Sequence, residues 1–522
     1  MAASLDAEVT ALARHLAEAG DSRHRRVVES SWWTEQMLEW AMSHPSFKTQ
    51  LFRFVDVFPS TVDDADVVRH LCEYFEGSNA PKLLDVGLDA AEHLPLGRAA
   101  AASLARRNIR RVAQQFIVGA DPRAAVERLE RLWRGGSAFT VDLLGEKTLT
   151  ESEADHYAAR VEDLVAVLCE CSRRWPADER LERDDLGPLP RVNVSVKPTA
   201  LASRYAPLTA DEGLEQAKSR LRPILRRAIA AGAFVHLDAE HYDVKDLTLQ
   251  LFRELLGEPD LAEVEAGVVI QAYTRDSFRD LADLIAFSAE RPRPITVRLV
   301  KGAYWDTETV TAQAAGWPAP VYVRKEETDA NYERCIRLLH DHHGKVRAAF
   351  GTHNLRSISY AVQYARSKGI PDDGYEIQLL YGMAEPIHTA VRRLGLRLRV
   401  YAPVGDLVPG MAYLVRRLLE NTANESFVRR RFVEGRALDE LLAPPAPEPP
   451  AGPAEVLAAP TETDPSSPGD YHPEPVAEWR DASARARFGR SIERVRHRGF
   501  GLVVPASIGG RRVMTTDTIY SV

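Results

Sequence analysis

The spacing of hydrophobic positions changes at about residue 138, from a helical repeat to an alternation of short strands and helices. Before that point apolar residues recur three and four positions apart, as in Leu5, Val9 and Leu12, which predicts helices. The segment Trp32–Phe58 continues this pattern with many aromatic residues, and residues 99–118 are rich in Ala and Arg. None of these residues has catalytic spacing, so we interpret residues 1–130 as a helical arm or domain.

From residue 138 onward, short apolar runs of strand length alternate with amphipathic segments of helical length, such as Leu214–Ala231, Ser277–Ala289 and Ser357–Ser367. Eight such alternations predict an α/β fold, a distorted (βα)8 TIM-like barrel over residues 131–435. A doubly wound open sheet is the alternative, but it usually carries a Gly-rich first turn, which is missing here. The predicted strands are Phe139–Leu144, Arg191–Val196, Ala233–Leu237, Val268–Tyr273, Ile295–Val300, Val346–Phe350, Glu376–Leu380 and Leu396–Ala402.

The remainder of the chain differs in composition. Residues 436–475 are dominated by Pro, Ala and Glu and bury too little surface to order themselves, so we expect a linker. Residues 476–522 begin with a charged helical pattern and end in GFGLVVPASIGGRRVMTTDTIYSV, which is typical of a hairpin or a pair of edge strands.

Composition and charge exclude several classes of protein. Hydrophobic residues make up 45% and charged residues 27%, as in soluble globular proteins. The net charge of −8, without a basic block, argues against nucleic-acid binding. The chain contains no secretory signal pattern and no apolar run of membrane-spanning length, so we expect a cytoplasmic protein. The cysteines lack metal or redox spacing and are expected to be reduced thiols: Cys72, Cys169, Cys171 and Cys335.

Polar and aromatic residues gather at the ends of the predicted strands. In a (βα)8 barrel the carboxyl ends of the strands meet at one face, where active sites form. Seven of the eight predicted strands end in such residues, which is hard to attribute to chance. Taken singly, each has a simpler explanation: Asp238 can cap a helix, Tyr304 and Trp305 can be packing aromatics, and His353 can be a core histidine. The strand-end residues are Lys197, Asp238, Glu240, Gln271, Tyr273, Arg298, Lys301–Trp305, Thr352–Asn354, Gln378, Leu380 and Tyr401.

The helix predicted after the last strand carries four residues with a shared face. Tyr413, Arg416, Arg417 and Glu420 are spaced i, i+3, i+4 and i+7. Two adjacent guanidinium groups can bind one carboxylate in a bidentate manner, and Glu420 can orient one of them. The alternative is a solvated face with an ordinary ion pair. No HExxH, no His/Cys cluster and no serine-elbow pattern is present, so we expect neither a metal site nor serine chemistry.

Five motifs occur in the order found in proline dehydrogenases, and the chain resembles that family from about residue 139 to residue 432. They are LDAE (237–240), VIQAY (269–273), RLVKGAYWD (298–306), THN (352–354) and YLVRRLLEN (413–421). SHPSFKTQLFRFVDVFP (43–59) resembles the helical arm of the proline utilization A proteins, a bifunctional branch of the same family.

The resemblance implies an FAD cofactor across the carboxyl-terminal mouth of the barrel. Arg298 would lie beside the flavin ring and stabilise negative charge, and Gln271 would hydrogen-bond the ring. The absence of a GxGxxG fingerprint is expected for this non-Rossmann site. The remaining cofactor contacts implied are Lys301, Gly302, Ala303 and Trp305, with Lys325, Thr352, His353, Asn354 and Gln378 serving the ribityl, pyrophosphate and adenosine portions.

The resemblance also implies oxidation of L-proline to Δ1-pyrroline-5-carboxylate by hydride transfer to flavin N5. Lys197, Arg416 and Arg417 would hold the carboxylate of proline, and the Arg–Glu420 pair would close over it. Asp238 would pair with Lys197 or Tyr401, so that Asp238, Arg298, Lys197 and Tyr401 form the catalytic set. The walls of the proline site would be Tyr304, Leu380, Tyr401 and Tyr413.

Further partners follow from the same resemblance. Electrons would pass to a quinone, which implies transient peripheral contact with a membrane. Residues 476–522 resemble the start of the aldehyde dehydrogenase domain of proline utilization A proteins, without an NAD-binding segment or a catalytic Cys motif. We therefore expect only the first of the two reactions, in a truncated form of a bifunctional enzyme. The alternatives are a non-catalytic flavin-binding barrel and a barrel enzyme for another amine or a phosphorylated substrate.

Overall fold

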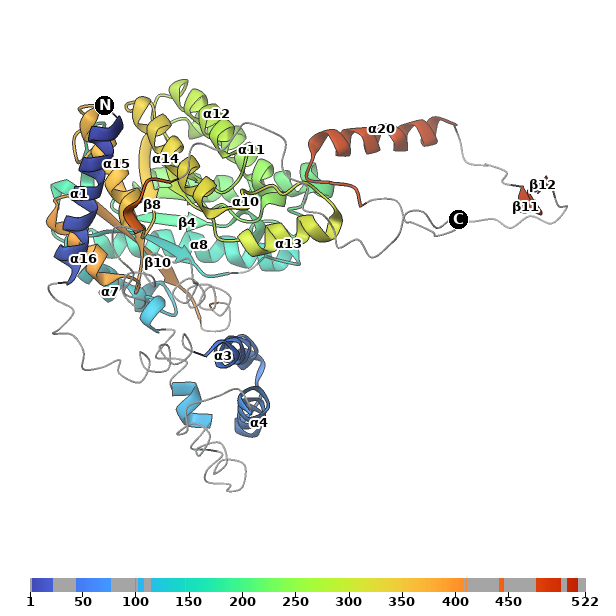
Figure 1. The fold of residues 1–522 in the computed structure, drawn as a ribbon, viewed down its shortest axis with the longest axis horizontal. Coiled ribbons are helices and arrows are strands. Elements are labelled where there is room, and N and C mark those ends of the chain that lie inside the picture. The colour runs from blue at the N-terminus through green and yellow to red at the C-terminus, as the bar shows by residue number, and fades with distance from the viewer. Residues whose placement is uncertain are drawn as a thin grey trace. The chain divides into compact units, whose positions relative to one another are not determined.

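The computed structural model describes residues 2–21, 44–76, 99, 102–107, 114–145, 147–406, 410, 441–445, 476–498 and 505–514. The chain divides into two compact units, residues 1–465 and 466–522, which are described separately. The first unit contains a closed barrel of parallel strands surrounded by helices (Figure 1).

The closed barrel confirms the predicted fold class. Its strands follow one another in the order β1-β10-β9-β8-β7-β6-β5-β4, and β1 closes the ring by pairing with both β10 and β4. This closure excludes the open doubly wound sheet. Every predicted strand is present, with bounds that agree within two residues. The strands are β1 (Ala138–Leu143), β4 (Asn193–Val196), β5 (Phe234–Leu237), β6 (Ala266–Gln271), β7 (Thr296–Val300), β8 (Arg347–Gly351), β9 (Tyr375–Leu380) and β10 (Arg397–Val404).

Helices cover the outside of the barrel, and the main apolar core lies between them and the outward-facing strand residues. The predicted helix at residues 277–289 is observed with the same bounds, and those at 214–231 and 357–367 begin four and two residues earlier. The covering helices are α8 (Glu151–Ser172), α10 (Ala210–Ala231), α11 (Lys245–Leu256), α12 (Ser277–Ala289), α13 (Trp305–Ala315), α14 (Lys325–Asp341), α15 (Leu355–Ser367) and α16 (Glu385–Arg393). Short connecting turns are α9 (Glu179–Glu182), η3 (Pro198–Ala200), η4 (Pro207–Thr209), η5 (Tyr242–Val244) and η6 (Pro259–Leu261).

The N-terminal region is helical where it is described, as predicted. Helix α1 (Ala2–Asp21) lies along α15 and α16 (Figure 1), where it buries Val9 and Leu16. Helices α3 (Pro45–Val57) and α4 (Asp64–Phe75), joined by η2 (Phe58–Ser60), share an apolar cluster of their own. Helix α7 (Pro122–Arg134) packs against β1 and α8.

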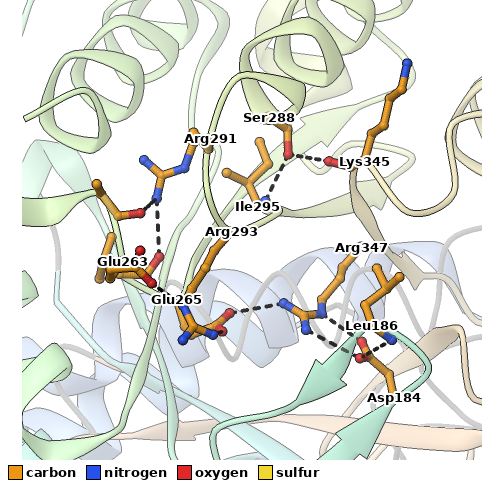
Figure 2. Close-up of polar contacts among 12 residues, drawn as sticks. Asp184, Leu186, Glu263, Glu265, Ser288, Arg291, Arg293, Ile295, Lys345 and Arg347 are labelled. Carbon is orange, nitrogen blue, oxygen red and sulfur yellow. Dashed lines mark hydrogen bonds and ion pairs between the residues drawn. The ribbon is translucent and has the colours of Figure 1, made fainter. Parts of the chain in front are cut away.

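A network of ion pairs joins the amino-terminal ends of the strands (Figure 2). Arg347, at the start of β8, donates to Asp184 at 2.7 Å and to Glu265 at 3.2 Å, and Arg293 donates to Glu265 at 3.0 Å. Asp184 belongs to a two-stranded hairpin, β2 (Arg183–Asp184) and β3 (Gly187–Pro188), that the hydrophobic pattern did not predict. Arg347 and Asp184 are both buried, so this pair is part of the interior.

The second unit contains helix α20 (Ala482–Arg498) and an antiparallel pair, β11 (Ala506–Ile508) and β12 (Arg511–Val513), which confirms the predicted helix and hairpin. Of the predicted linker, only residues 441–445 are described, and the predicted domain boundaries stay predictions. All four cysteines are free thiols, as expected. Within the described ranges, no helix is both long and apolar enough to cross a membrane.

The buried histidine His340 generates a prediction about acid stability. It lies on α14 with its ring 5.1 Å from that of Phe350 and 5.3 Å from that of Tyr375, and burial lowers its pKa to about 4. The unfolded chain binds a proton near pH 6.5 and the folded chain does not, so stability falls as the pH drops from 6.5 towards 4. We predict that His340→Phe recovers about 2 kcal/mol of the stability lost between pH 7 and pH 5.

The measurement is the urea midpoint as a function of pH. The matched control is His156→Gln, since His156 is exposed on α8 and its replacement removes a histidine without altering the core. An unaltered slope for His340→Phe would mean that His340 is protonated within the fold.

Candidate active site

Asp238 is the centre of a charged cluster at the carboxyl-terminal ends of the strands. It follows β5 directly and is buried. One carboxylate oxygen accepts a hydrogen bond from Arg298 Nη1 at 2.9 Å, and the other accepts from the Tyr401 hydroxyl at 2.7 Å. Lys197 Nζ lies 3.5 Å from that second oxygen. Asp238 therefore joins groups from three other strands or strand ends, β4, β7 and β10.

Lys197 is held between two carboxylates. Besides Asp238 it pairs with Asp142 of β1, and its backbone N–H donates to the Tyr157 hydroxyl at 3.3 Å. Burial alone would lower the pKa of Lys197, but the two carboxylates raise it overall. The amine is therefore a cation at neutral pH, fixed at the mouth of the barrel.

Arg298 projects from β7 into the barrel interior and is buried. Its guanidinium donates to Asp238, to Ser195 Oγ at 3.2 Å from both terminal nitrogens, and to Gln378 Oε1 at 2.6 Å from Nε. It also lies 5.2 Å from the centre of the Tyr401 ring. These contacts come from β4, β5, β9 and β10, so closure of the barrel is what fixes this side chain.

The loop after β7 packs against an aromatic ring. Gly302 has φ +136°, and a Cβ at this position would lie 2.4 Å from the ring of Tyr273. Glycine is thus required by the backbone conformation and by the close approach of the ring. Trp305 begins α13, donates its indole N–H to the Tyr322 carbonyl at 2.9 Å and leaves its side chain partly exposed. The Tyr304 ring lies 4.3 Å from that of His241.

Lys301 and Lys325 converge on one carboxylate, Asp329. Burial alone would raise the pKa of Asp329, but the two lysines lower it overall. Two cations on one anion leave an excess positive charge beside the mouth. Such a group suits a phosphate or diphosphate.

The segment Thr352–Asn354 forms the start of α15. The Asn354 side chain caps the helix by accepting from Ser357 N at 3.1 Å, and Thr352 Oγ1 accepts from Asn354 N at 3.1 Å. His353 Nε2 accepts from the Leu380 N–H at 3.2 Å, which requires that this ring nitrogen carries no proton. The backbone N–H groups of this helix start face the same end of the barrel as the strand termini.

Two glutamines among the sequence-predicted cofactor contacts have different surroundings. Gln271 donates to the Glu240 carbonyl at 2.9 Å, at the end of β6. Gln378 lies in the interior, where it accepts from Arg298 and donates to Glu376 Oε1 at 2.5 Å. Ala303 is exposed in the loop before α13.

The structure thus brings together Lys197, Asp238, Arg298 and Tyr401, and gathers most of the other predicted residues around the same end of the barrel. Tyr413, Arg416, Arg417 and Glu420 lie outside the described residues. In the described part of the chain, no group of three or more His, Cys, Asp or Glu residues is arranged to hold a metal ion.

Sequence reasoning missed four residues of the cluster: Asp142, Tyr157, Ser195 and Glu376. Asp142 carried a usable signal, since it is the one charged residue of a mainly apolar predicted strand. Ser195 and Glu376 also lie within predicted strands, at inward positions. Tyr157 lies on α8, and nothing in its local pattern distinguished it from a core aromatic.

Two family models and several known proteins match this chain. The proline dehydrogenase family model matches residues 125–430, and the model of the proline utilization A N-terminal domain matches residues 6–116. The bifunctional protein PutA of Escherichia coli is 32% identical over 400 residues, which cover 75% of this chain and 28% of that protein. The proline dehydrogenase of Deinococcus radiodurans is 29% identical over 332 residues, which cover 64% of this chain and 93% of that protein.

A solved structure is also similar. The crystal structure of proline utilization A from Bdellovibrio bacteriovorus, inactivated by N-propargylglycine, has a TM-score of 0.86 and 38% identity. The match covers 98% of this chain and 50% of that chain. This chain therefore spans about a quarter of the length of the E. coli bifunctional relative and half of this solved one.

The glycine at 302 generates a prediction. We expect Gly302→Ala to destabilise the protein by about 2 kcal/mol or more, because the new methyl group must displace the Tyr273 ring and the backbone must leave a conformation that favours glycine. Gly316→Ala is the matched control: its φ is also positive at +67°, but nothing lies within 4 Å of the added Cβ. We expect that control to cost about 1 kcal/mol. Urea unfolding of both variants tests this, and equal losses would show that the contact with Tyr273 contributes nothing.

Proposed function

The chain belongs to the proline dehydrogenase family, and from this premise we propose that it oxidises L-proline to Δ1-pyrroline-5-carboxylate with FAD. The observation that carries the proposal is the Asp238-centred cluster. It holds two cations, Lys197 and Arg298, and a tyrosine hydroxyl at the carboxyl-terminal end of a (βα)8 barrel, where substrates of this fold bind.

Lys197 is suited to bind the carboxylate of proline. A lysine amine has three N–H donors. Among the described residues, Asp142 accepts a hydrogen bond from one of them, and Asp238 is an ion-pair partner at 3.5 Å. A further donor is available to an anion at the mouth. Arg416 and Arg417, on the face shared with Tyr413 and Glu420, are proposed to complete the carboxylate site.

The walls of the proline site are proposed to be Tyr304, Leu380 and Tyr401, with Tyr413. Leu380 ends β9 and pairs in register with Tyr401 of β10, so these two side chains are neighbours at the mouth. A flat, partly apolar surface of this kind fits the pyrrolidine ring and leaves its nitrogen-bearing edge free to face the cofactor.

The residues present fit FAD. The excess positive charge of Lys301 and Lys325 over Asp329 suits the pyrophosphate, and the start of α15 at Thr352–Asn354 adds backbone donors. The exposed indole of Trp305 offers an aromatic surface, and Arg298 places a fixed positive charge within the barrel mouth. Gln271, Gly302 and Ala303 line the remaining approach. When bound, the flavin supplies a two-electron acceptor.

In the proposed reaction the C–H bond on the ring carbon next to nitrogen breaks and a C=N bond forms, and a bound flavin would supply the acceptor for the hydride. The amine proton is released to water. The protein's contribution is positioning: Lys197 fixes the carboxylate while the tyrosines fix the ring plane, so that two reactants meet in one orientation. Arg298 stabilises the negative charge that develops on the cofactor. Asp238 fixes the positions of Lys197, Arg298 and Tyr401 relative to one another, because it contacts all three side chains.

The wider setting is proposed from the family. The electrons pass to a quinone, which requires transient contact with a membrane surface by a cytoplasmic protein. The reaction is the first step of proline catabolism to glutamate. Residues 476–522 are proposed to lead into an aldehyde dehydrogenase domain that acts on the product. A barrel that binds flavin without turnover is the second candidate, and intact Lys197 and Asp238 disfavour it.

The first prediction of this proposal is spectroscopic. The purified protein should carry flavin absorption bands, and L-proline added without oxygen should bleach them, because the substrate delivers two electrons to the cofactor. D-proline is the control, since its carboxylate projects from the opposite face of the ring and misses Lys197. Bands that persist with L-proline would support flavin binding but contradict the assignment of L-proline as the substrate. A colourless protein that FAD cannot reconstitute would contradict the whole proposal.

The second prediction concerns Lys197. We expect the double variant Lys197→Met/Asp142→Asn to raise KM for L-proline roughly 10- to 100-fold, the value of one lost charge-assisted hydrogen bond. The second substitution avoids leaving an additional unpaired carboxylate at the site. Asp142→Asn alone is the control and should change KM much less, with flavin content unchanged in both. Equal KM values for the double variant and the control would exclude Lys197 from the carboxylate site.

A further inference from the structure

A second charged layer lies in the barrel interior on the amino-terminal side of Arg298, and the proposed reaction makes no use of it. Glu376, the second residue of β9, accepts from Arg399 Nε at 2.8 and 3.0 Å through its two oxygens. Arg399 also donates to the Phe139 carbonyl at 2.8 Å. Glu376 and Arg399 are 7% and 3% exposed. Both charged side chains are therefore buried, and neither is an ordinary surface charge.

Gln378 connects this layer to Arg298. Its Oε1 accepts from Arg298 Nε at 2.6 Å, and its Nε2 donates to Glu376 Oε1 at 2.5 Å. The direction of the amide is dictated by chemistry, because a guanidinium can only donate and a carboxylate can only accept. The amide thus transmits the position of Glu376 to Arg298, and its oxygen presents negative charge to the guanidinium.

Glu376 is ionised in this environment. Burial alone would raise its pKa, but Arg399, Arg397 and the hydrogen bond from Gln378 lower it overall. The amino-terminal side is polar as well: Glu376, Gln378, Arg399 and His236 line a cavity of about 20 Å³, which is room for about one water molecule. Charges therefore alternate along the barrel interior, from Asp238 through Arg298 and Glu376 to Arg399.

We propose that Glu376 is a positioning residue for the reaction: through Gln378 it fixes Arg298, and its negative charge lowers the positive potential that Arg298 presents to the flavin. The inference rests on the proposed function. Removing that charge makes the site more positive, so the flavin accepts electrons more readily and its reduction potential rises. The charge of Glu376 acts on the flavin site without contacting it, because little water screens a charge that is buried in the barrel interior.

The test is the reduction potential of the flavin in Glu376→Gln, measured on the reconstituted holoenzyme by titration against a redox dye. We expect the equilibrium constant for two-electron reduction to increase about tenfold, which corresponds to about +30 mV. The matched control is Asp184→Asn, which weakens another buried carboxylate–arginine pair at the amino-terminal end of the barrel, with Arg347. This control should lower the stability but leave the potential unchanged.

Two further variants keep the inference testable if Glu376→Gln does not fold. Glu376→Gln/Arg399→Gln removes both charges of the pair and should return the potential towards the wild-type value. Gln378→Met leaves Glu376 and Arg399 paired but cuts the link to Arg298, and should shift the potential in the positive direction. An electrostatic role requires these two variants to differ, whereas simple loosening of the barrel moves both alike.

The outcomes separate the inference from the function on which it rests. A wild-type protein that L-proline bleaches, with a potential unchanged in Glu376→Gln and in Gln378→Met, overturns the role of Glu376 and leaves the function intact. Equal shifts in Glu376→Gln and Asp184→Asn overturn it as well, because the effect is then not specific to the carboxylate that is linked to Arg298. A wild-type protein that binds no flavin overturns the proposed function and this inference together.

Discussion

Closing eight parallel strands into a barrel turns alternate side chains of every strand into one enclosed interior, and in this chain many of those inward positions are charged. In most (βα)8 barrels the same positions are filled by branched apolar residues. Here Asp142, Ser195, Arg298, Glu376 and Arg399 occupy them. A buried charge is tolerated only when it is paired and hydrogen-bonded, so the strand order and register are coupled to the pairing of these groups. Arg298 illustrates the dependence, because its acceptors come from three other strands.

This arrangement is not explained by stability. Replacing a buried ion pair by apolar residues of similar volume is often neutral or stabilising, whereas removing one partner is costly. The free energy that holds the fold comes instead from the apolar shell between the strands and the surrounding helices, including Leu16 of α1 and Leu129 of α7. The apolar shell therefore supplies the stability that allows the barrel to keep a polar interior. We infer that the polar interior is present because it has a role in the chemistry.

The hydrophobic pattern was sufficient to predict all eight strands, because parallel barrel strands are short apolar runs with long helical crossovers, and both periods are strong. The residues at the strand ends followed from the same reading. Asp142 was missed because its partner, Lys197, lies 55 residues away and only closure of the barrel brings the two together. The β2–β3 hairpin was missed because two-residue strands leave no periodic signal. Gln378 was predicted as a site residue. Its contacts with Arg298 and Glu376 depend on the orientation of its side-chain amide, which the spacing of residues along the chain does not determine.

The two ends of the barrel surround their cations differently. At the amino-terminal end, Arg347 directs its fork to two carboxylates, Asp184 and Glu265, so cation and anion neutralise each other within the protein. At the carboxyl-terminal end, the described hydrogen bonds use four of the five N–H donors of Arg298 and one of the three of Lys197, which also forms an ion pair with Asp238. Each cation is held rigidly by these contacts and still has capacity to bind an anion. Rigid placement with donors to spare is what a site for a small carboxylate requires, because the orientation is fixed before the substrate arrives.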